Sequence, residues 1–164
     1  MKPKVVIFDL DATLFDGGHR VHLIPEDPSK DYNWDAFNKE CVNDKTIPWT
    51  MSIFFGLRDQ LLEGTAPFTD IYFMTSRSSQ CEEETLEALH KAGLGGFPLI
   101  MRERGDHNLS VDTKSAMLDD LEASGVEIVM AFDDEPEIVE MMNKRGIYAI
   151  KVPQWWDYGY KVSE

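Results

Sequence analysis

Two aspartates, Asp9 and Asp11, directly follow a run of apolar residues at positions 5–8. Because the side chains of an extended chain alternate between its two sides, residues two apart face the same way, and both carboxylates can reach one small site. Carboxylates this close repel each other unless a cation or a shared proton compensates their charge. The spacing therefore predicts either a site for metal or acid–base chemistry or, more simply, an acidic turn after a buried strand.

A second acidic pair, Asp133 and Asp134, follows another apolar run at positions 128–132. Carboxylate oxygens gathered at the ends of neighbouring strands suit Mg²⁺, which prefers octahedral oxygen coordination and keeps several of its waters. The structural alternative is that these aspartates only cap a helix that begins near Pro136. The same geometry thus occurs twice, as a metal site shared by two strands would require.

Groups that could bind a phosphate stand at two further places in the chain. Thr75, Ser76 and Arg77 follow the apolar residues of another expected strand and offer hydroxyl and guanidinium groups to phosphate oxygens. Lys114 lies near the start of an expected helix, where backbone amides and its ammonium group can face an anion together. A lone lysine near a helix start is more often exposed to solvent than catalytic, so only the combination indicates a site.

Strand-like and helical patterns alternate along most of the chain. Short β-branched or aromatic runs are typical of buried strands, and the later ones alternate with helical patterns that each end at a glycine. This alternation predicts the α/β class with a doubly wound parallel sheet. The expected strands are 4–9, 70–75, 97–101, 127–132 and 147–152, and the later helices are 80–92, 112–123 and 136–145.

One long segment separates the first expected strand from the second and contains a single clear crossing helix, 51–63. The part at 15–50 is expected to be an insertion with a short helix around 34–42. It leaves the carboxyl end of the first strand, where ligands bind in open α/β sheets, so we expect it to form a wall or partial lid of the site. No repeat, linker or large cap divides the chain, and 1–164 is expected to be a single domain.

Composition limits the classes of function. The net charge of −14 at pH 7 would repel a polyanion at long range, so any affinity for phosphate must be local. The apolar runs are too short to span a bilayer, and no membrane partner is expected. The N-terminal residues do not have the pattern of a signal peptide, and Cys41 and Cys81 match no disulfide framework or metal motif. We therefore expect a cytoplasmic protein with reduced thiols.

The residues described above occur in a known order. Taken together they resemble the four motifs of the haloacid dehalogenase (HAD) superfamily, and the resemblance covers essentially the whole chain. Ala12 departs from the family pattern, which has glycine there, and this change is expected to tighten the local backbone. The motifs are Asp9-Leu10-Asp11-Ala12-Thr13, Thr75, Lys114 and Asp133-Asp134.

The resemblance implies a HAD-like Rossmannoid fold and a Mg²⁺-dependent phosphatase that passes through a covalent aspartyl-phosphate. Asp9 would attack phosphorus, and Asp11, protonated at the start, would protonate the leaving oxygen and then activate water. Thr75 and Lys114 would neutralise the transferring phosphoryl group. The implied ligands of Mg²⁺ are Asp9, the backbone carbonyl of Asp11, Asp133 and Asp134, the last directly or through water.

A narrower resemblance concerns the substrate. The run Arg102-Glu103-Arg104-Gly105-Asp106 is similar to the 3′-phosphatase domain of phage polynucleotide kinase/phosphatase, and so is the position of Arg20 eleven residues after Asp9. For each arginine, the simpler alternative is a surface ion pair with one of the 30 acidic residues. The resemblance implies that Arg20, Ser76, Arg77 and Arg102 bind the terminal phosphate and its flanking backbone.

Three functions remain open from the sequence. A polynucleotide 3′-phosphatase is favoured by the arginines and by the lack of a large cap, which leaves the site open to the end of a chain. A phosphatase for free nucleotides or other small phosphoesters is favoured by the net charge. A non-catalytic phosphate-binding protein is disfavoured, because Asp9 and Asp11 are both present. The sequence has no kinase phosphate-binding loop, so we expect a stand-alone phosphatase, and it does not specify an oligomeric state.

Overall fold

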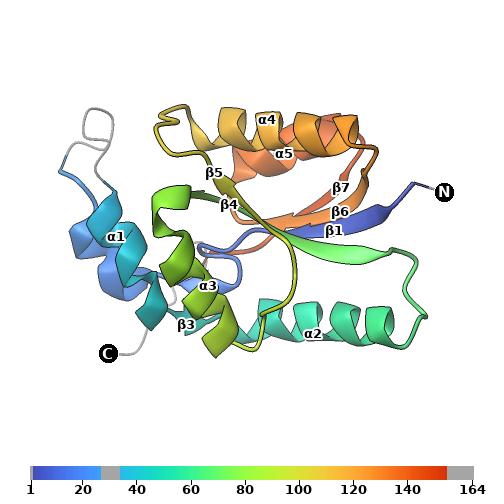
Figure 1. The fold of residues 1–164 in the computed structure, drawn as a ribbon, viewed down its shortest axis with the longest axis horizontal. Helices are drawn as coiled ribbons and strands as arrows, with labels where there is room; N and C mark the ends of the chain where they lie inside the picture. The colour runs from blue at the N-terminus through green and yellow to red at the C-terminus, as the bar shows by residue number, and fades with distance from the viewer. Residues whose placement is uncertain (1, 27–33, 155–164) are drawn as a thin grey trace.

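The computed structural model describes residues 2–26 and 34–154, and its centre is a five-stranded sheet in the order β5-β4-β1-β6-β7 (Figure 1). All four neighbouring pairs of strands in this sheet are parallel. The predicted doubly wound α/β fold is therefore confirmed, with each expected strand present and β4 longer than expected. The strands are β1 (Lys4–Phe8), β4 (Asp70–Ser78), β5 (Leu99–Arg102), β6 (Glu127–Asp133) and β7 (Tyr148–Lys151).

The path of the chain through the sheet places a crevice beside β1. From β1 the chain moves outward through β4 to β5, and then it crosses back to β6 on the other side of β1. In open α/β sheets, ligands bind outside the carboxyl ends of the strands at the point where the winding reverses. The tips of β1 and β6 lie at that point.

Helices cover both faces of the sheet because the residues of β1 alternate between two apolar cores. Val6 and Phe8 belong to the core under α2 and α3, whereas Val5 and Ile7 belong to the core under α4 and α5. Figure 1 shows α4 and α5 above the sheet and α2 and α3 below it. These helices are α2 (Pro48–Leu62), α3 (Glu82–Lys91), α4 (Ser110–Ala123) and α5 (Pro136–Lys144).

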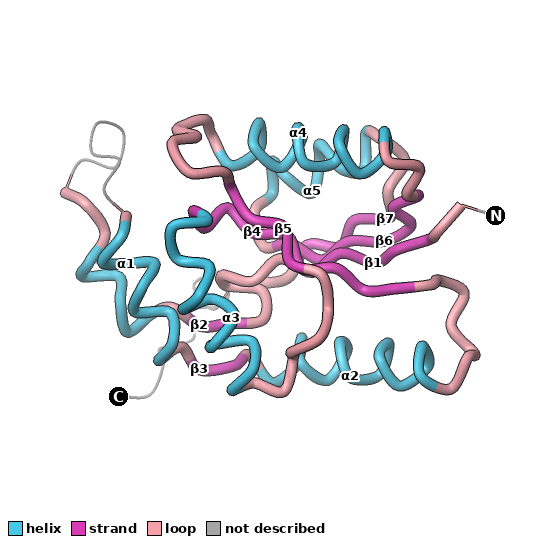
Figure 2. Tube along the Cα trace, in the orientation of Figure 1, coloured by secondary structure: helices cyan, strands magenta, loops and turns pink. Residues whose placement is uncertain are grey.

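The insertion between β1 and α2 forms a small layer of short elements. Figure 2 shows it at the end of the molecule toward which β1 runs, and its second 3₁₀ helix packs against α3. The helix expected at 34–42 is present in two pieces, one α-helical and one 3₁₀. The elements are β2 (Phe15–Asp16), η1 (Gly18–Leu23), α1 (Asp35–Lys39), η2 (Glu40–Asn43) and β3 (Lys45–Thr46), with β2 and β3 antiparallel.

Backbone conformations agree with two expectations from the sequence. Gly93, Gly125 and Gly146, which follow the three later helices, have φ values of 73°, 88° and 84°, in the left-handed region that glycine adopts most easily. Ala12 has a φ of 57°, and it is the one non-glycine residue with positive φ in the described chain. Because this region costs about 1–2 kcal/mol for a residue with a side chain, the backbone beside Asp11 is strained.

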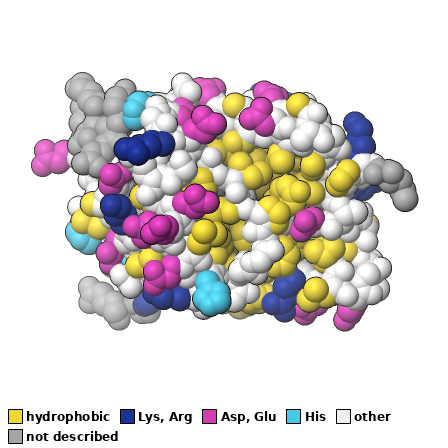
Figure 3. Space-filling view, viewed as in Figure 1, with side chains coloured by type: hydrophobic (Ala, Val, Ile, Leu, Met, Phe, Trp, Pro, Cys, Tyr) yellow, Lys and Arg dark blue, Asp and Glu magenta, His cyan; other side chains and the backbone are white. Residues whose placement is uncertain are grey.

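The surface divides into charged and apolar regions. On the face shown in Figure 3, charged side chains crowd the end that carries α1 and α3, and apolar side chains fill the middle. The charged end is the end toward which β1 and β4 run (Figure 1). Across residues 2–26 and 34–154, no helix has both the length and the apolar character needed to cross a bilayer.

Candidate active site

Asp9 follows β1 directly, is buried, and meets groups from two other elements. The ammonium group of Lys114, on α4, donates to Oδ1 of Asp9 at 2.7 Å and to Oδ2 of Asp133 at 2.6 Å. Asp133 is the last residue of β6, and Asp134 follows it. One carboxylate oxygen from each of Asp9, Asp133 and Asp134 lies within 4.8 Å of the others. The structure thus brings these four predicted site residues together.

This cluster holds three buried carboxylates and one ammonium group. Burial raises the pKa of Asp9 to about 7, against the attraction of Lys114 and with added repulsion from Asp133 and Asp11. Burial, together with repulsion from Asp9 and Asp133, raises the pKa of Asp134 to about 9. Full ionisation of the cluster therefore requires more positive charge than Lys114 supplies.

A divalent cation fits this set of donors. The three carboxylates offer hard oxygen atoms in close proximity, and Lys114 compensates only part of their charge, which are the conditions under which proteins bind Mg²⁺. Three of the predicted ligands, Asp9, Asp133 and Asp134, supply these oxygens. The carboxylate of Asp11 lies outside the cluster, and the expectation that its backbone carbonyl binds the metal stays a prediction.

Asp11 is instead held by two arginines. Arg77 donates from Nε to Oδ2 at 2.8 Å and from its NH2 nitrogen to Oδ1 at 2.9 Å, and Arg20 donates to Oδ1 as well. Burial acts to raise the pKa of Asp11, but Arg77 and Arg20 outweigh it and hold this pKa well below its usual range. Both arginines face Asp11 whereas Asp9 shares one lysine with Asp133, so the protein groups alone favour the ionised form of Asp11. The expected split, in which Mg²⁺ bound to Asp9 keeps it ionised while Asp11 starts protonated, stays a prediction.

Asp44, at the end of the insertion, completes the arginine network. Arg20 donates to both of its carboxylate oxygens at 2.8 Å, and the NH2 nitrogen of Arg77 lies 3.3 Å from Oδ2. Nε2 of His19 lies 2.9 Å from the Oδ1 atom. Asp44 was not among the residues predicted from the sequence, because one aspartate in an irregular segment has no periodic or motif signal. The only available signal was charge balance, since two arginines at one site need two carboxylates.

The end of β4 carries the predicted hydroxyl groups. Thr75 is buried, and its Oγ1 accepts a hydrogen bond from the backbone N–H of Arg77 at 3.2 Å. Oγ of Ser76 and the NH1 nitrogen of Arg77 are buried and have no hydrogen-bond partner among the described residues. A buried polar group left unpaired costs about 1–3 kcal/mol, and the expectation that Ser76 and Arg77 bind the substrate stays a prediction.

Arg102, the last residue of β5, reaches into the turn that follows. Its Nε donates to the carbonyl oxygen of Ser76 at 2.8 Å, and its NH1 nitrogen donates to the carbonyl oxygen of Asn108 at 2.7 Å. In the same turn, Asp106 accepts from the hydroxyl of Thr113 at 2.6 Å and lies 3.6 Å from the NH1 nitrogen of Arg102. The guanidinium of Arg102 therefore fastens the turn, and its role in substrate binding stays a prediction.

A cavity of about 540 Å³ connects these groups. Two distant segments contribute to its lining: the insertion with Trp34 and Phe37, whose ring centroids lie 5.7 Å apart, and the turn at 105–110. Arg20 does not border the cavity but reaches Asp11, which does. The predicted site residues in the lining are Asp9, Asp11, Ser76, Arg77, Arg102, Lys114 and Asp134.

The parallel sheet reverses its winding beside β1, carboxylates lie at the tips of β1 and β6, and a lysine on α4 lies between them. This arrangement is typical of a HAD-like α/β protein. The chain belongs to the HAD superfamily, subfamily IIIB (acid phosphatase), whose family model matches residues 1–154. The resemblance seen in the sequence motifs is confirmed: the chain has the fold and the motif residues of this superfamily.

Solved structures share the fold at low sequence identity. A chain of the Pnkp1/Rnl/Hen1 RNA repair complex has a TM-score of 0.71 and 19% identity over 93% of this chain and 43% of that chain. The class C acid phosphatase from Bacillus anthracis with tungstate bound has a TM-score of 0.62 and 16% identity over 100% of this chain and 76% of that chain. The chain thus spans less than half of the RNA repair protein. No curated protein sequence gives a significant match.

Proposed function

We propose that this chain is a Mg²⁺-dependent phosphomonoesterase that forms an aspartyl-phosphate on Asp9 and removes 3′-phosphates from the ends of nucleic acids. The observation that carries the proposal is the position of Asp9, which borders the cavity, accepts a hydrogen bond from Lys114 and belongs to the carboxylate cluster. A carboxylate nucleophile requires positive charge near itself and near the phosphoryl oxygens. Lys114 and a cation held by the cluster would provide that charge.

The reaction needs two steps. In the first, an oxygen of Asp9 attacks phosphorus while the bond to the leaving oxygen breaks, and Asp11 donates a proton to that oxygen. In the second, water attacks phosphorus and gives its proton to Asp11, and the bond to Asp9 breaks. Mg²⁺ bound by Asp9, Asp133 and Asp134 would neutralise charge on the phosphoryl oxygens. Lys114 stays protonated, because Asp9 and Asp133 outweigh the burial that acts to lower its pKa.

The arginines connect substrate binding to the role of Asp11. Arg20 and Arg77 both pair with Asp11, and a phosphate in the cavity would compete with this carboxylate for the guanidinium group of Arg77, which lines the cavity. When Arg77 turns toward phosphate, Asp11 loses the larger of the two opposite charges that lower its pKa, and it can then hold the proton that the first step requires. Oγ of Ser76 and the NH1 nitrogen of Arg77 offer further donors.

The size and lining of the cavity support a nucleic-acid end as substrate. Its volume of about 540 Å³ exceeds what a phosphate group alone requires, and the aromatic rings of Trp34 and Phe37 offer surfaces on which a base or sugar can pack. The fold is also shared with a chain of an RNA repair complex. The second candidate is a phosphatase for free nucleotides, which the net charge of −14 favours because a longer polyanion is repelled more strongly.

The test measures phosphate release from a 3′-phosphorylated oligonucleotide and from a 3′-mononucleotide, in ribose and deoxyribose forms. We expect a higher kcat/KM on the oligonucleotide, loss of activity with a chelator and recovery with Mg²⁺. A higher kcat/KM on the mononucleotide would favour the second candidate. Binding of both substrates without turnover would instead indicate a non-catalytic phosphate-binding protein.

Asp9→Asn is expected to abolish turnover while the fold remains. The amide is a poor nucleophile and metal ligand, but the substitution removes one of three mutually repelling carboxylates, so the melting temperature should hold or rise. Mg²⁺ should stabilise the wild-type protein more than the variant. Asp59→Asn, on α2 outside the cavity, is the matched control. Turnover near the wild-type rate in Asp9→Asn would contradict the covalent mechanism.

A further inference from the structure

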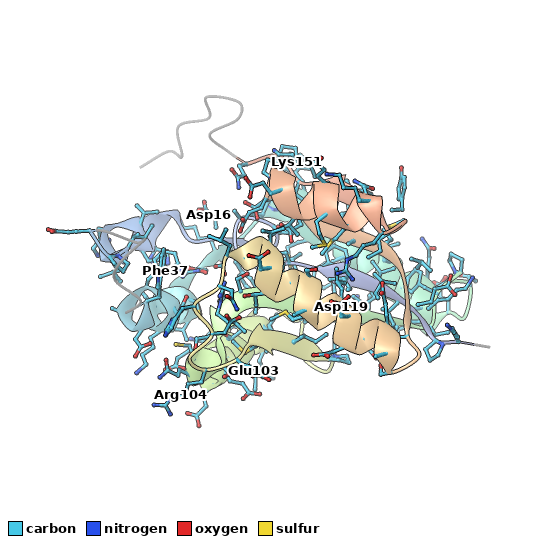
Figure 4. All side chains as sticks on the ribbon, turned by 90° about the horizontal axis from the view of Figure 1, so that it is seen from above. Asp16, Phe37, Glu103, Arg104, Asp119 and Lys151 are labelled. Atoms are coloured by element: carbon cyan, nitrogen blue, oxygen red, sulfur yellow. The ribbon has the colours of Figure 1, made fainter. Side chains whose placement is uncertain are left out.

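Arg104 stands at the rim of the cavity, in the turn between β5 and α4. Its side chain is exposed, and two nearby residues line the cavity: Arg102, two positions before it, and Gly105, which follows it. Figure 4 shows Arg104 pointing outward at the end of the molecule that also carries Phe37, one of the aromatic residues of the lining. The part of a bound ligand that extends out of the cavity on this side would lie close to the guanidinium group of Arg104.

Gln80 orients this guanidinium. With the side-chain amide turned so that both of its ends find partners, its oxygen accepts a hydrogen bond from Nε of Arg104 at 3.0 Å and its nitrogen donates to Oδ1 of Asp35 at 3.3 Å. Gln80 and Asp35 both belong to the cavity lining. Because the contact uses Nε, the two terminal nitrogens of Arg104 are left to bind another acceptor.

The other basic groups of the site are already neutralised by carboxylates. Arg20 and Arg77 pair with Asp11 and Asp44, and Lys114 pairs with Asp9 and Asp133. Arg102 pairs with Asp106. Among residues 2–26 and 34–154, by contrast, Arg104 forms no ion pair. It is therefore a cation at the cavity rim whose charge remains to attract an anion.

We propose that Arg104 binds the phosphodiester that precedes the terminal nucleotide, and so favours a polynucleotide over a mononucleotide. The inference rests on the proposed function: the scissile phosphate would lie at Asp9 with the terminal nucleoside in the cavity, and the next phosphate would emerge at the rim. A guanidinium with two free nitrogens suits a phosphodiester, which presents two charged oxygens. In a protein with a net charge of −14, affinity for this phosphate must come from such a local contact.

The experiment compares three substrates: a short 3′-phosphorylated oligonucleotide, the same oligonucleotide with an uncharged methylphosphonate at the linkage before the terminal nucleotide, and the 3′-mononucleotide. The sugar is the one that the wild-type enzyme turns over faster. The variants are Arg104→Ala, Arg104→Lys and, as a matched control, Arg58→Ala on α2, outside the cavity. Melting temperatures show whether each variant is folded.

We expect Arg104→Ala to lower kcat/KM on the charged oligonucleotide by about fivefold, as for one exposed charged contact, and to leave the mononucleotide unchanged. The methylphosphonate should lower kcat/KM of the wild-type enzyme by a similar factor and should not affect Arg104→Ala. Arg104→Lys should keep part of the effect, and Arg58→Ala should have none.

Three results would overturn the inference. The wild-type enzyme could prefer the oligonucleotide to the mononucleotide and yet have the same kcat/KM on the charged oligonucleotide and on its methylphosphonate analogue. Arg104 then does not bind this linkage, while the proposed function stands. If Arg104→Ala lowers kcat/KM equally on all three substrates, Arg104 acts on the terminal phosphate or on the turn. A wild-type enzyme that prefers the mononucleotide would overturn both the inference and the nucleic-acid substrate.

Discussion

Asp44 is a carboxylate of the insertion that contacts Arg77 at the end of β4. Its side chain is fully buried, and so are those of its partners Arg20 and Arg77. With Asp11, these residues form a set of two guanidinium groups and two carboxylates that carries no net charge. Removal of one carboxylate would leave a buried positive charge without a partner. The orientation of both arginines, and hence what they offer to a phosphate, depends on Asp44.

Asp44→Asn is expected to lower the free energy of unfolding by about 3 kcal/mol, because breaking a buried ion pair leaves the other charge uncompensated. For a chain of this length, the melting temperature should fall by roughly 6–12 °C. The value of kcat/KM should also fall, since Arg20 and Arg77 lose the oxygens that orient them. Thermal melts and phosphate-release assays measure both effects.

The matched control for this prediction is Asp59→Asn, which removes the exposed partner of Arg58. Such a surface pair contributes little, so the free energy of unfolding should change by less than about 0.5 kcal/mol. Similar small effects in the two variants would mean that Asp44 does not organise the arginines.

The sequence predicts single site residues well where they follow a strand. Asp9 and Asp133 each end an apolar run, and parallel strands bring such ends to one edge of the sheet, so their meeting could be foreseen. The partners of the arginines could not be foreseen, because Asp44 lies 24 positions from Arg20 and 33 from Arg77, in a segment without periodicity. Ionic contacts of this kind depend on how the insertion packs, which no local pattern records.

At the scale of elements, the turn between β5 and α4 shapes one part of the cavity. It is fastened from both sides, by Arg102 at the end of β5 and by Thr113 in α4, whose hydroxyl donates to Asp106. Burial acts to raise the pKa of Asp106, but the hydrogen bonds from Thr113 and Asn108 and the charge of Arg102 outweigh it, and this pKa is lowered. Asp106 is thus stabilised in the ionised form that accepts these bonds.

Arg102→Ala is expected to loosen this turn. The substitution removes charged hydrogen bonds to the carbonyl oxygens of Ser76 and Asn108. We therefore expect the free energy of unfolding to fall by about 1.5 kcal/mol and the melting temperature to fall by roughly 3–6 °C. Trypsin should cut faster after Arg104, and kcat/KM should fall. Arg102→Lys should lose stability as well, because an ammonium group cannot reproduce the planar fork.

A different result would support the role in substrate binding that the sequence resemblance implies for Arg102. If Arg102→Ala keeps the wild-type melting temperature and trypsin resistance but loses activity on a 3′-phosphorylated oligonucleotide, its guanidinium serves the substrate and not the turn. Arg58→Ala is again the control, because Arg58 lies on α2, pairs with Asp59 and is not part of the cavity lining.

The regular elements could be predicted from the sequence, whereas the two-residue strands and the first 3₁₀ helix could not. Strands of the central sheet are buried apolar runs, and the later helices end at glycines with positive φ, so both leave a pattern. The antiparallel pair Phe15–Asp16 and Lys45–Thr46 has only two residues in each strand, which is too short to show alternation. The 3₁₀ helix at Gly18–Leu23, which carries Arg20, has no strong sequence signature either.

At the scale of the whole molecule, two electrostatic effects oppose each other. The chain carries 30 acidic and 16 basic residues, and the resulting net charge of −14 repels an approaching polyanion. The site, in contrast, offers positive groups that act over short distances, among them Lys114 and Arg77 in the cavity lining and Arg104 at its rim. Salt affects these two effects differently, because it screens interactions between distant charges more than contacts inside a partly buried site.

The dependence of kcat/KM on ionic strength therefore tests which effect governs capture of the substrate. The screening length falls from about 30 Å at 0.01 M to about 10 Å at 0.1 M salt, so added salt in this range removes most of the long-range repulsion. We expect kcat/KM for a 3′-phosphorylated oligonucleotide to rise over this range, and the rise to be smaller for a 3′-mononucleotide, which carries fewer charges. A basic nucleic-acid enzyme behaves in the opposite way, since its affinity falls steeply as salt is added. Initial-rate assays at a fixed Mg²⁺ concentration measure this dependence. A steep fall of kcat/KM with added salt would show that local cationic contacts outweigh the electrostatic field of the whole protein.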